Sequence, residues 1–311
     1  MVVHSRGNAV AKWLVGLQGR KQRDRSGLYV LEGAQPVALA ARARADIRAL
    51  VVSESMAGRW EVQALADTLA GTRCDLVVLS DALFAGVLPR ARGAGVAAVV
   101  HQQWVALDDV VITPSSAWLA LKCTEHPGTI GTVLRTADAA GCAGAILVGH
   151  SADPYDPVAV RASLGAVLTQ QLARATPEGF AKWRRRLDCF VVGASPTGSG
   201  EFRSVAYDGP LLLLFGGERS GISPELSALC DTVVRIPMLG QIDSLHLSVA
   251  SALLMYEVAY QRERQSDPRG ADGSLCSPAL LAAQTHEERR GARGNQLAGE
   301  TVVGKLAARR K

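Results

Sequence analysis

The sequence predicts an α/β protein of two domains followed by a C-terminal tail. Its 311 residues suggest two domains, at roughly 100 to 200 residues per domain. From residue 117 onward, continuous aliphatic runs alternate with helical patterns, which is typical of a mainly parallel sheet covered on both faces. A composition that is 48% hydrophobic can fill the cores of both domains.

Residues 1–106 are expected to form the first α/β domain. Its helical and β-rich patterns alternate: helices are predicted at residues 9–17 and 36–44, and strands at residues 28–31, 47–52, 76–79 and 96–100. No cluster of catalytic residue types falls in this half. A segment rich in Asp, Pro and Ser, residues 107–116, then interrupts the pattern and is the expected linker.

Residues 117–264 are expected to form the second domain. Strands are predicted at residues 118–121, 145–148, 189–192, 211–215 and 232–236, and helices at residues 130–140, 158–171, 177–187, 224–230 and 244–264. In such a sheet a ligand is expected at the carboxyl ends of the strands, where the loops gather. The tail, residues 265–311, is expected to be flexible apart from a short helical pattern near residues 278–288.

Basic charge is concentrated at the N-terminus. Residues 1–25 contain six Arg or Lys side chains and one acidic residue, Asp24, so they carry the whole net charge of +5. Such an arm can contact phosphate or form a solvated helix face, and charge alone favours neither.

Composition also excludes several classes of protein. The longest aliphatic-aromatic run, residues 211–215, is far shorter than the roughly 20 residues that span a bilayer, so no membrane protein is expected. The six cysteines include no Cys-x-x-Cys pair and the six histidines are scattered. We therefore expect no metal site and a reducing, cytoplasmic location.

Three loops place glycine and polar residues directly after a predicted strand or at the start of a predicted helix. They are His126-Pro-Gly-Thr-Ile-Gly-Thr-Val-Leu-Arg135, Phe215-Gly-Gly-Glu-Arg-Ser-Gly-Ile222 and Ile236-Pro-Met-Leu-Gly-Gln-Ile-Asp-Ser-Leu-His246. Glycines there let the backbone approach a ligand closely. None of the loops matches the glycine fingerprint of dinucleotide-binding proteins, which weakens the nicotinamide-dependent oxidoreductase that an α/β pattern alone would suggest.

Together, the three loops resemble the signature motifs of the SpoU (TrmH-like) family of RNA 2′-O-ribose methyltransferases, part of the SPOUT class. The family motifs run Pro-Gly-Asn-x-Gly-x-x-x-Arg, Phe-Gly-x-Glu-x-x-Gly and Ile-Pro-Met-x-Gly-x-x-x-Ser-Leu-Asn. Residues 5–33 resemble the family's ribosomal-protein-like substrate-binding domain. Residues 148–157 and 160–165 most resemble the avilamycin-resistance subgroup, which acts on 23S rRNA.

The resemblance implies a C-terminal α/β trefoil knot, S-adenosylmethionine in the knot loops, and a homodimer whose active site draws on both subunits. It implies an RNA substrate, with 23S rRNA as the leading hypothesis and tRNA as the rival, and suggests a role in ribosome-targeted antibiotic resistance. The motif positions place the cofactor against Gly216, Gly217, Ile236, Met238, Gly240 and Leu245. They place the functional polar groups at Arg135, Glu218 and Ser244, and RNA contacts are expected from Arg20, Lys21, Arg23 and Arg161.

The chemistry of methyl transfer agrees with this set of residues. Holding the sulfonium methyl group in line with a ribose oxygen can contribute about 7 to 11 kcal/mol without a metal. Arg135 could hold the target phosphate through its planar guanidinium, which is a poor proton acceptor. Ser244 could hydrogen-bond the nucleophile or Arg135, and Glu218 could orient Arg135 or a backbone amide.

Two positions depart from the family motifs. Thr129 and His246 stand where the first and third motifs have asparagine, and the only asparagines of the chain are Asn8 and Asn295. His246 could serve as a general base, because imidazole titrates near neutral pH. The same replacements could instead mark a site that has lost activity. The second hypothesis is therefore a SPOUT-fold RNA-binding protein that keeps the cofactor pocket without methylating.

Overall fold

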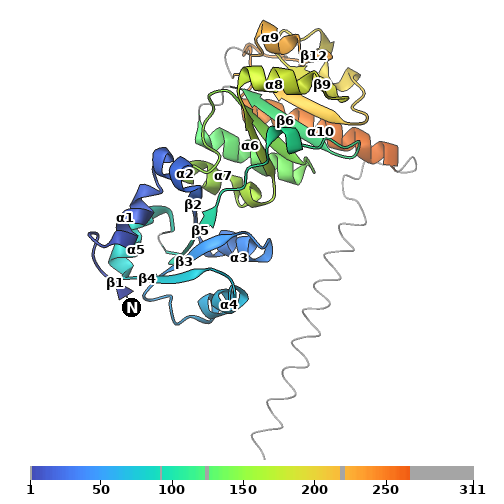
Figure 1. Cartoon of the computed structure of the whole chain (residues 1–311). Helices are drawn as coiled ribbons and strands as arrows, with labels where there is room; N and C mark the ends of the chain where they lie inside the picture. Colours follow the sequence, from blue (N-terminus) through green and yellow to red (C-terminus); the bar gives the residue numbers. More distant parts are fainter. Residues whose placement is uncertain (1, 92, 123–125, 218–220, 267–311) are drawn as a thin grey trace, which may run out of the picture. The chain divides into compact units, whose positions relative to one another are not determined.

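Two β-sheets organise the chain in a computed structural model that describes residues 2–91, 93–122, 126–217 and 221–266 (Figure 1). Both sheets lie within one compact unit, residues 1–261. Of the second unit, residues 262–311, the structure describes only the end of one helix, so the helical pattern expected near residues 278–288 lies outside the described residues.

The first sheet has five strands in the order β1-β4-β3-β5-β2, and β5 runs antiparallel to both of its neighbours. Alternate residues point to opposite faces: Tyr29 and Leu31 share one core with α3 and α4, whereas Leu28 and Val30 share another with α1 and α5. The elements are β1 (Val2–Val3), α1 (Ala9–Gly16), α2 (Arg20–Ser26), β2 (Leu28–Glu32), α3 (Ala34–Arg42), β3 (Ile47–Ser53), α4 (Trp60–Thr68), β4 (Asp75–Leu79), α5 (Asp81–Val87), a 3-10 turn (Pro89–Ala91) and β5 (Val96–His101).

The second sheet has seven strands in the order β10-β12-β9-β11-β6-β7-β8, and all of their pairings are parallel. This confirms the parallel sheet predicted from the aliphatic runs. The strands are β6 (Ala117–Lys122), β7 (Gly144–Val148), β8 (Gln171–Ala175), β9 (Phe190–Ala194), β10 (Gly200–Glu201), β11 (Leu211–Phe215) and β12 (Thr232–Arg235).

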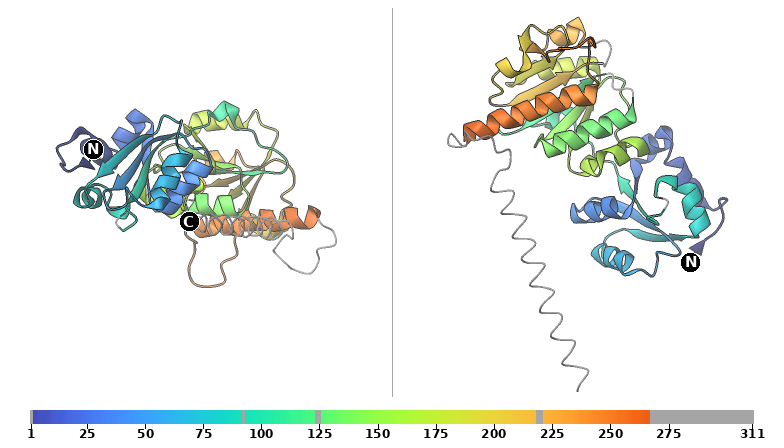
Figure 2. Two further views of the ribbon diagram at one scale, coloured as in Figure 1. Left: turned by 90° about the horizontal axis from the view of Figure 1, so that it is seen from below. Right: turned by 180° about the vertical axis from the view of Figure 1, so that it is seen from behind.

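Helices cover both faces of the second sheet, and the central strand β11 is therefore buried on both sides. Leu213 packs in one core with α6, α7 and α10, and Leu214 packs in another with α8 and α9. Figure 2 shows α6 and α10 together on one face of this sheet. The elements outside the sheet are 3-10 turns at Leu107–Asp109, Ala166–Leu168 and Phe202–Ser204, and α6 (Pro127–Ala139), α7 (Pro157–Ser163), α8 (Pro177–Arg184), α9 (Pro224–Ser227) and α10 (Leu247–Ser266).

The predicted helix at residues 158–171 is wrong. Helix α7 ends at Ser163, Leu164 and Gly165 both have positive φ values of 49° and 102°, and the chain then enters β8. Glycine just past a helix end is a stop signal, and the continuing apolar pattern obscured it.

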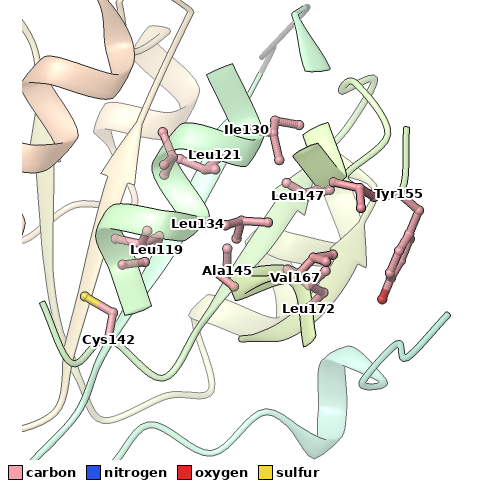
Figure 3. Close-up of a cluster of buried hydrophobic side chains, with 14 of the residues drawn as sticks. Leu119, Leu121, Ile130, Leu134, Cys142, Ala145, Leu147, Tyr155, Val167 and Leu172 are labelled. Atoms are coloured by element: carbon pink, nitrogen blue, oxygen red, sulfur yellow. The ribbon is translucent and has the colours of Figure 1, made fainter. Parts of the chain in front are cut away.

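Helix α6 is the element that fixes the first motif in space. Figure 3 shows Ile130 and Leu134 of α6 facing a cluster that includes Leu119 and Leu121 of β6 and Leu147 of β7.

Among the described residues, no helix is long and apolar enough to span a membrane.

Candidate functional site

A hollow lies at the carboxyl ends of three neighbouring parallel strands, β9, β11 and β12, where the sequence predicted a ligand. Residues that end or follow these strands line it: residues 194–196, 215–217, Ile236, Met238 and residues 243–245. Including the space at its open side, the hollow is about 590 Å³. Parallel pairing therefore brings two of the three motifs together.

Most of the predicted cofactor residues line this hollow. Gly216, Gly217, Ile236, Met238 and Leu245 do so, and so does Ser244, whereas Gly240, Arg135 and His246 do not. Glu218 lies outside the described residues.

The lining is mainly apolar, with a few oxygen groups. Apolar side chains come from Phe215, Val234, Ile236, Met238, Leu245, Leu247 and Ala250, and polar ones from Ser195, Asp243 and Ser244. Apolar walls suit a purine ring, hydroxyls suit a ribose, and a carboxylate suits a cationic group. The residues thus fit S-adenosylmethionine. Among the described residues, no three His, Cys, Asp or Glu side chains gather to hold a metal ion.

The glycines of the motifs have different structural reasons. A Cβ on Gly216 would lie 1.7 Å from the carbonyl oxygen of Gly221, so this tight loop requires glycine. A Cβ on Gly131 would instead lie 2.2 Å from the carbonyl oxygen of Ala159. Gly131 therefore lets α6 pack closely on α7, which is a reason for this motif glycine within the fold itself.

Arg135 is exposed on α6 and forms no hydrogen bond or ion pair with any other residue that the structure describes. The hydroxyl of Ser244 donates to Oδ1 of Asp243 at 3.3 Å rather than contacting Arg135. The guanidinium of Arg135 is thus available to an incoming anion.

The two replaced asparagine positions contact each other. Oγ1 of Thr129, in the first turn of α6, lies 3.4 Å from Nε2 of His246, just before α10. Thr129 is 6% exposed. Nδ1 of His246 lies 2.7 Å from the hydroxyl of Ser248 and accepts the backbone N–H of Ser248 at 3.3 Å.

Of the residues predicted to contact RNA, Arg23 is buried within the protein. It is 1% exposed, with Nε 2.8 Å from Asp153 and Nη2 3.1 Å from Asp156. Its Nη1 donates to the carbonyl oxygens of Leu17 and Gln18. A side chain enclosed in this way cannot reach a phosphate, so the prediction is wrong for Arg23.

The other three predicted RNA contacts are exposed. Arg20 donates to the carbonyl oxygen of Ser151 at 3.0 Å and lies 3.5 Å from Asp24. Arg161, on α7, lines a second hollow together with Arg90 and Glu32. Lys21 follows Arg20 on α2.

Sequence reasoning missed residues 194–196 and Asp243 as lining residues. Ser195-Pro-Thr-Gly198 follows β9 directly and has the composition of the predicted loops. Its place beside the second motif depends on β9 pairing with both β11 and β12, a strand order that the sequence pattern did not provide.

Comparison with known proteins identifies relatives. Residues 116–256 match the model of the SpoU rRNA methylase family, and residues 8–98 match that of the MRM3-like substrate binding domain. The 23S rRNA (uridine(2479)-2′-O)-methyltransferase of Streptomyces viridochromogenes is 30% identical over 268 residues, which cover 84% of this chain and 92% of the relative.

Two solved structures extend the similarity to the fold. An AdoMet-bound rRNA methyltransferase from Sinorhizobium meliloti aligns with a TM-score of 0.78 and 29% identity, over 89% of this chain and 99% of that one. The SpoU methyltransferase AviRb from Streptomyces viridochromogenes, in complex with AdoMet, aligns with a TM-score of 0.74 and 28% identity, over 82% and 98%.

Proposed function

Because the chain belongs to the SpoU rRNA methylase family, we propose that it methylates a ribose 2′-hydroxyl of 23S rRNA. The enzyme class, an RNA 2′-O-methyltransferase, and the cofactor, S-adenosylmethionine, follow from membership of the family and from its AdoMet-bound relatives. One observation in the chain itself supports the proposal most: the second and third motifs meet at one mainly apolar hollow.

S-adenosylmethionine supplies, when bound, a methyl group on a positively charged sulfur that a ribose oxygen can attack. The apolar walls of the hollow hold the adenine, and the exposed guanidinium of Arg135 binds an RNA phosphate near the target. Fixing the two partners in this way provides the alignment on which the rate depends.

The hydroxyl proton must leave the ribose as the methyl group arrives. Ser244 lines the hollow and already donates to Asp243 at 3.3 Å, and Asp243 lines the same hollow. A ribose hydroxyl that donates to Ser244 would therefore be one hydrogen bond from a carboxylate that can take the proton. This route assigns proton acceptance to Asp243 and leaves Arg135 to position the RNA.

We propose a homodimer formed through α10. Val249, Leu253, Tyr256 and Tyr260 are all exposed, and their spacing of four, three and four residues places them on one helix face. Such an apolar stripe indicates a protein partner. Light scattering should give twice the chain mass, and Leu253→Asp should halve it, whereas Trp60→Asp, at an exposed site on α4, should leave it unchanged.

The finer features of the fold are also proposals. Residues 1–106 would form the ribosomal-protein-like domain that binds RNA, with 107–116 as linker and 265–311 as tail, and Arg20, Lys21 and Arg161 would contact phosphate. Residues 117–264 would form the trefoil knot, as the resemblance to the family implies. An experimental backbone trace through residues 116–256 tests the knot.

The decisive experiment is transfer of tritiated methyl from S-adenosylmethionine to unmodified 23S rRNA, with Arg135→Ala as the control. We expect incorporation with the wild type and a loss of at least about a hundredfold in the variant. Ribose-methylation mapping in a deletion strain then identifies the nucleotide. Incorporation into tRNA alone would show that tRNA, and not 23S rRNA, is the substrate. No incorporation into any RNA pool would favour the non-methylating RNA-binding protein.

The proposed location is the cytoplasm. Among the described residues, Cys74, Cys189 and Cys230 are free thiols, which agrees with a reducing compartment. A contribution to antibiotic resistance is tested by comparing the drug sensitivity of the deletion strain with that of the strain complemented by Arg135→Ala.

A further inference from the structure

Thr129 and His246 are 117 positions apart, and each replaces a family asparagine, yet their side chains meet at 3.4 Å. One contact therefore joins the first motif to the third. If the two family asparagines had been lost independently of each other, there would be no reason for their replacements to be two side chains that can hydrogen-bond each other. The contact thus relates the two departures to a single structural feature.

The hydrogen-bond roles within this contact follow from the neighbouring groups. The backbone N–H of Ser248 can only donate, so Nδ1 of His246 must accept at 3.3 Å. The hydroxyl of Ser248, 2.7 Å from Nδ1, then donates to the same nitrogen. The neutral imidazole consequently carries its proton on Nε2, which donates to Oγ1 of Thr129. Both ring nitrogens are engaged, so this arrangement suits a positioning group better than a general base.

The two partners differ in how firmly the fold holds them. Thr129 is buried in α6, next to Ile130 in the core and two residues before Gly131, which packs against α7. The segment 236–246 is largely solvated, with Leu239 almost fully exposed and Ile242 mostly exposed. Apart from the buried Leu247 that follows it, this segment has little apolar burial to fix it. The hydrogen bond to Thr129 therefore attaches a loosely held segment to a rigid helix.

We propose that Thr129 and His246 act as one positioning pair, which anchors the segment 236–246 on α6 and so fixes Ser244 and Leu245 at the cofactor hollow. The pair takes the structural place of the two family asparagines. The proposal rests on the proposed function, because it assumes that S-adenosylmethionine occupies the hollow. Its consequence is coupling: once His246 is removed, removing the hydroxyl of Thr129 has little further effect.

The test is a double-mutant cycle read by calorimetric binding of S-adenosylhomocysteine, the demethylated cofactor. Thr129→Val should weaken binding about three- to tenfold, which is the range of about one hydrogen bond, and His246→Ala should weaken it at least as much, because that change also removes the hydrogen bonds to Ser248. The double variant should bind S-adenosylhomocysteine with about the same affinity as whichever single variant binds it less tightly. Thr132→Val is the matched control, because its hydroxyl lies one turn along α6 and bonds only the carbonyl oxygen of Gly128. It should stay within twofold of the wild type.

Rescue separates positioning from general destabilisation. Thr129→Ser keeps the hydroxyl and should bind like the wild type, and the Thr129→Asn, His246→Asn double variant should bind within threefold of it. Thermal unfolding of every variant shows whether the fold is kept. If His246→Ala does not fold, the Thr129→Val and Thr129→Ser comparison carries the test alone. Nitrogen NMR of the His246 ring should show the proton on Nε2.

Additive losses in the cycle, an effect of Thr129→Val equal to that of Thr132→Val, or a proton on Nδ1 would each overturn the positioning pair. These outcomes leave the proposed function intact, since the wild type would still bind S-adenosylhomocysteine and methylate RNA. A wild type that binds no S-adenosylhomocysteine would instead refute the proposed function.

Discussion

Replacing Arg23 with Ala tests whether this side chain stabilises the fold rather than binding RNA. The change removes two ion pairs and two hydrogen bonds to carbonyl oxygens. It leaves Asp153, which is 6% exposed, without its cationic partner. Breaking a buried ion pair from one side destabilises proteins by about 3 to 5 kcal/mol.

The lower end of that range applies here. In the variant, Asp153 still accepts a hydrogen bond of 2.9 Å from the backbone N–H of Tyr155. Asp156, about 25% exposed, still accepts one of 2.9 Å from the backbone N–H of Val158. We therefore expect the free energy of unfolding to fall by about 3 kcal/mol and the melting temperature to fall by about 6 to 12 °C.

Urea unfolding monitored by fluorescence measures this loss, and Lys21→Ala is the matched control. Lys21 is exposed on the same helix, so its removal should leave stability within about 0.5 kcal/mol. If Lys21 contacts a phosphate, the control should instead lower the salt dependence of RNA binding by about one unit of slope. A stable Arg23→Ala variant that loses salt-dependent RNA affinity would refute the burial argument and restore Arg23 as an RNA contact.

Three further predictions concern single positions. Gly216→Ala should weaken S-adenosylhomocysteine binding at least tenfold in calorimetry, because its Cβ would meet the backbone of Gly221, whereas Gly240→Ala, whose Cβ meets nothing within 4 Å, should have no effect; equal effects would contradict the pocket. Asp243→Asn should lower the rate of methyl transfer about a hundredfold at saturating S-adenosylmethionine, and an unchanged rate would rule out the proton route. Burial raises the pKa of the Glu32 carboxyl, so its charged form destabilises the folded state. At pH values above this raised pKa, Glu32→Gln should therefore increase the melting temperature, and at pH values below the ordinary pKa of 4.5 the increase should vanish.

The sequence predicted elements best where burial alone determines them. Strand β11 is apolar throughout because both of its faces are covered, and a continuous apolar run of only five residues has the length of a strand rather than that of a helix. Helix α2, Arg20–Ser26, was missed because its sequence is entirely polar. Its buried contact is Arg23, a residue type that composition assigns to the surface.

The site was predictable in its residues but not in its contacts. The motif resemblance placed Gly216, Ile236 and Leu245, and they line one hollow. The contact between Thr129 and His246 and the ion pair between Arg23 and Asp153 join residues more than 100 positions apart. Local periodicity carries no information about such partners, because they depend on how the elements pack.

The ion pairs also change how the basic N-terminal arm is interpreted. Arg23 is neutralised by Asp153 and Asp156, and Arg20 lies 3.5 Å from Asp24 and donates to a carbonyl oxygen. Much of the charge that seemed to be available to phosphate is therefore engaged within the fold. Arg135, which has no partner among the described residues, is free to bind an anion, and it lies on the helix that carries Thr129. Phosphate binding should thus depend more on Arg135 than on the arm, so Arg135→Ala should reduce RNA affinity more than Arg20→Ala does.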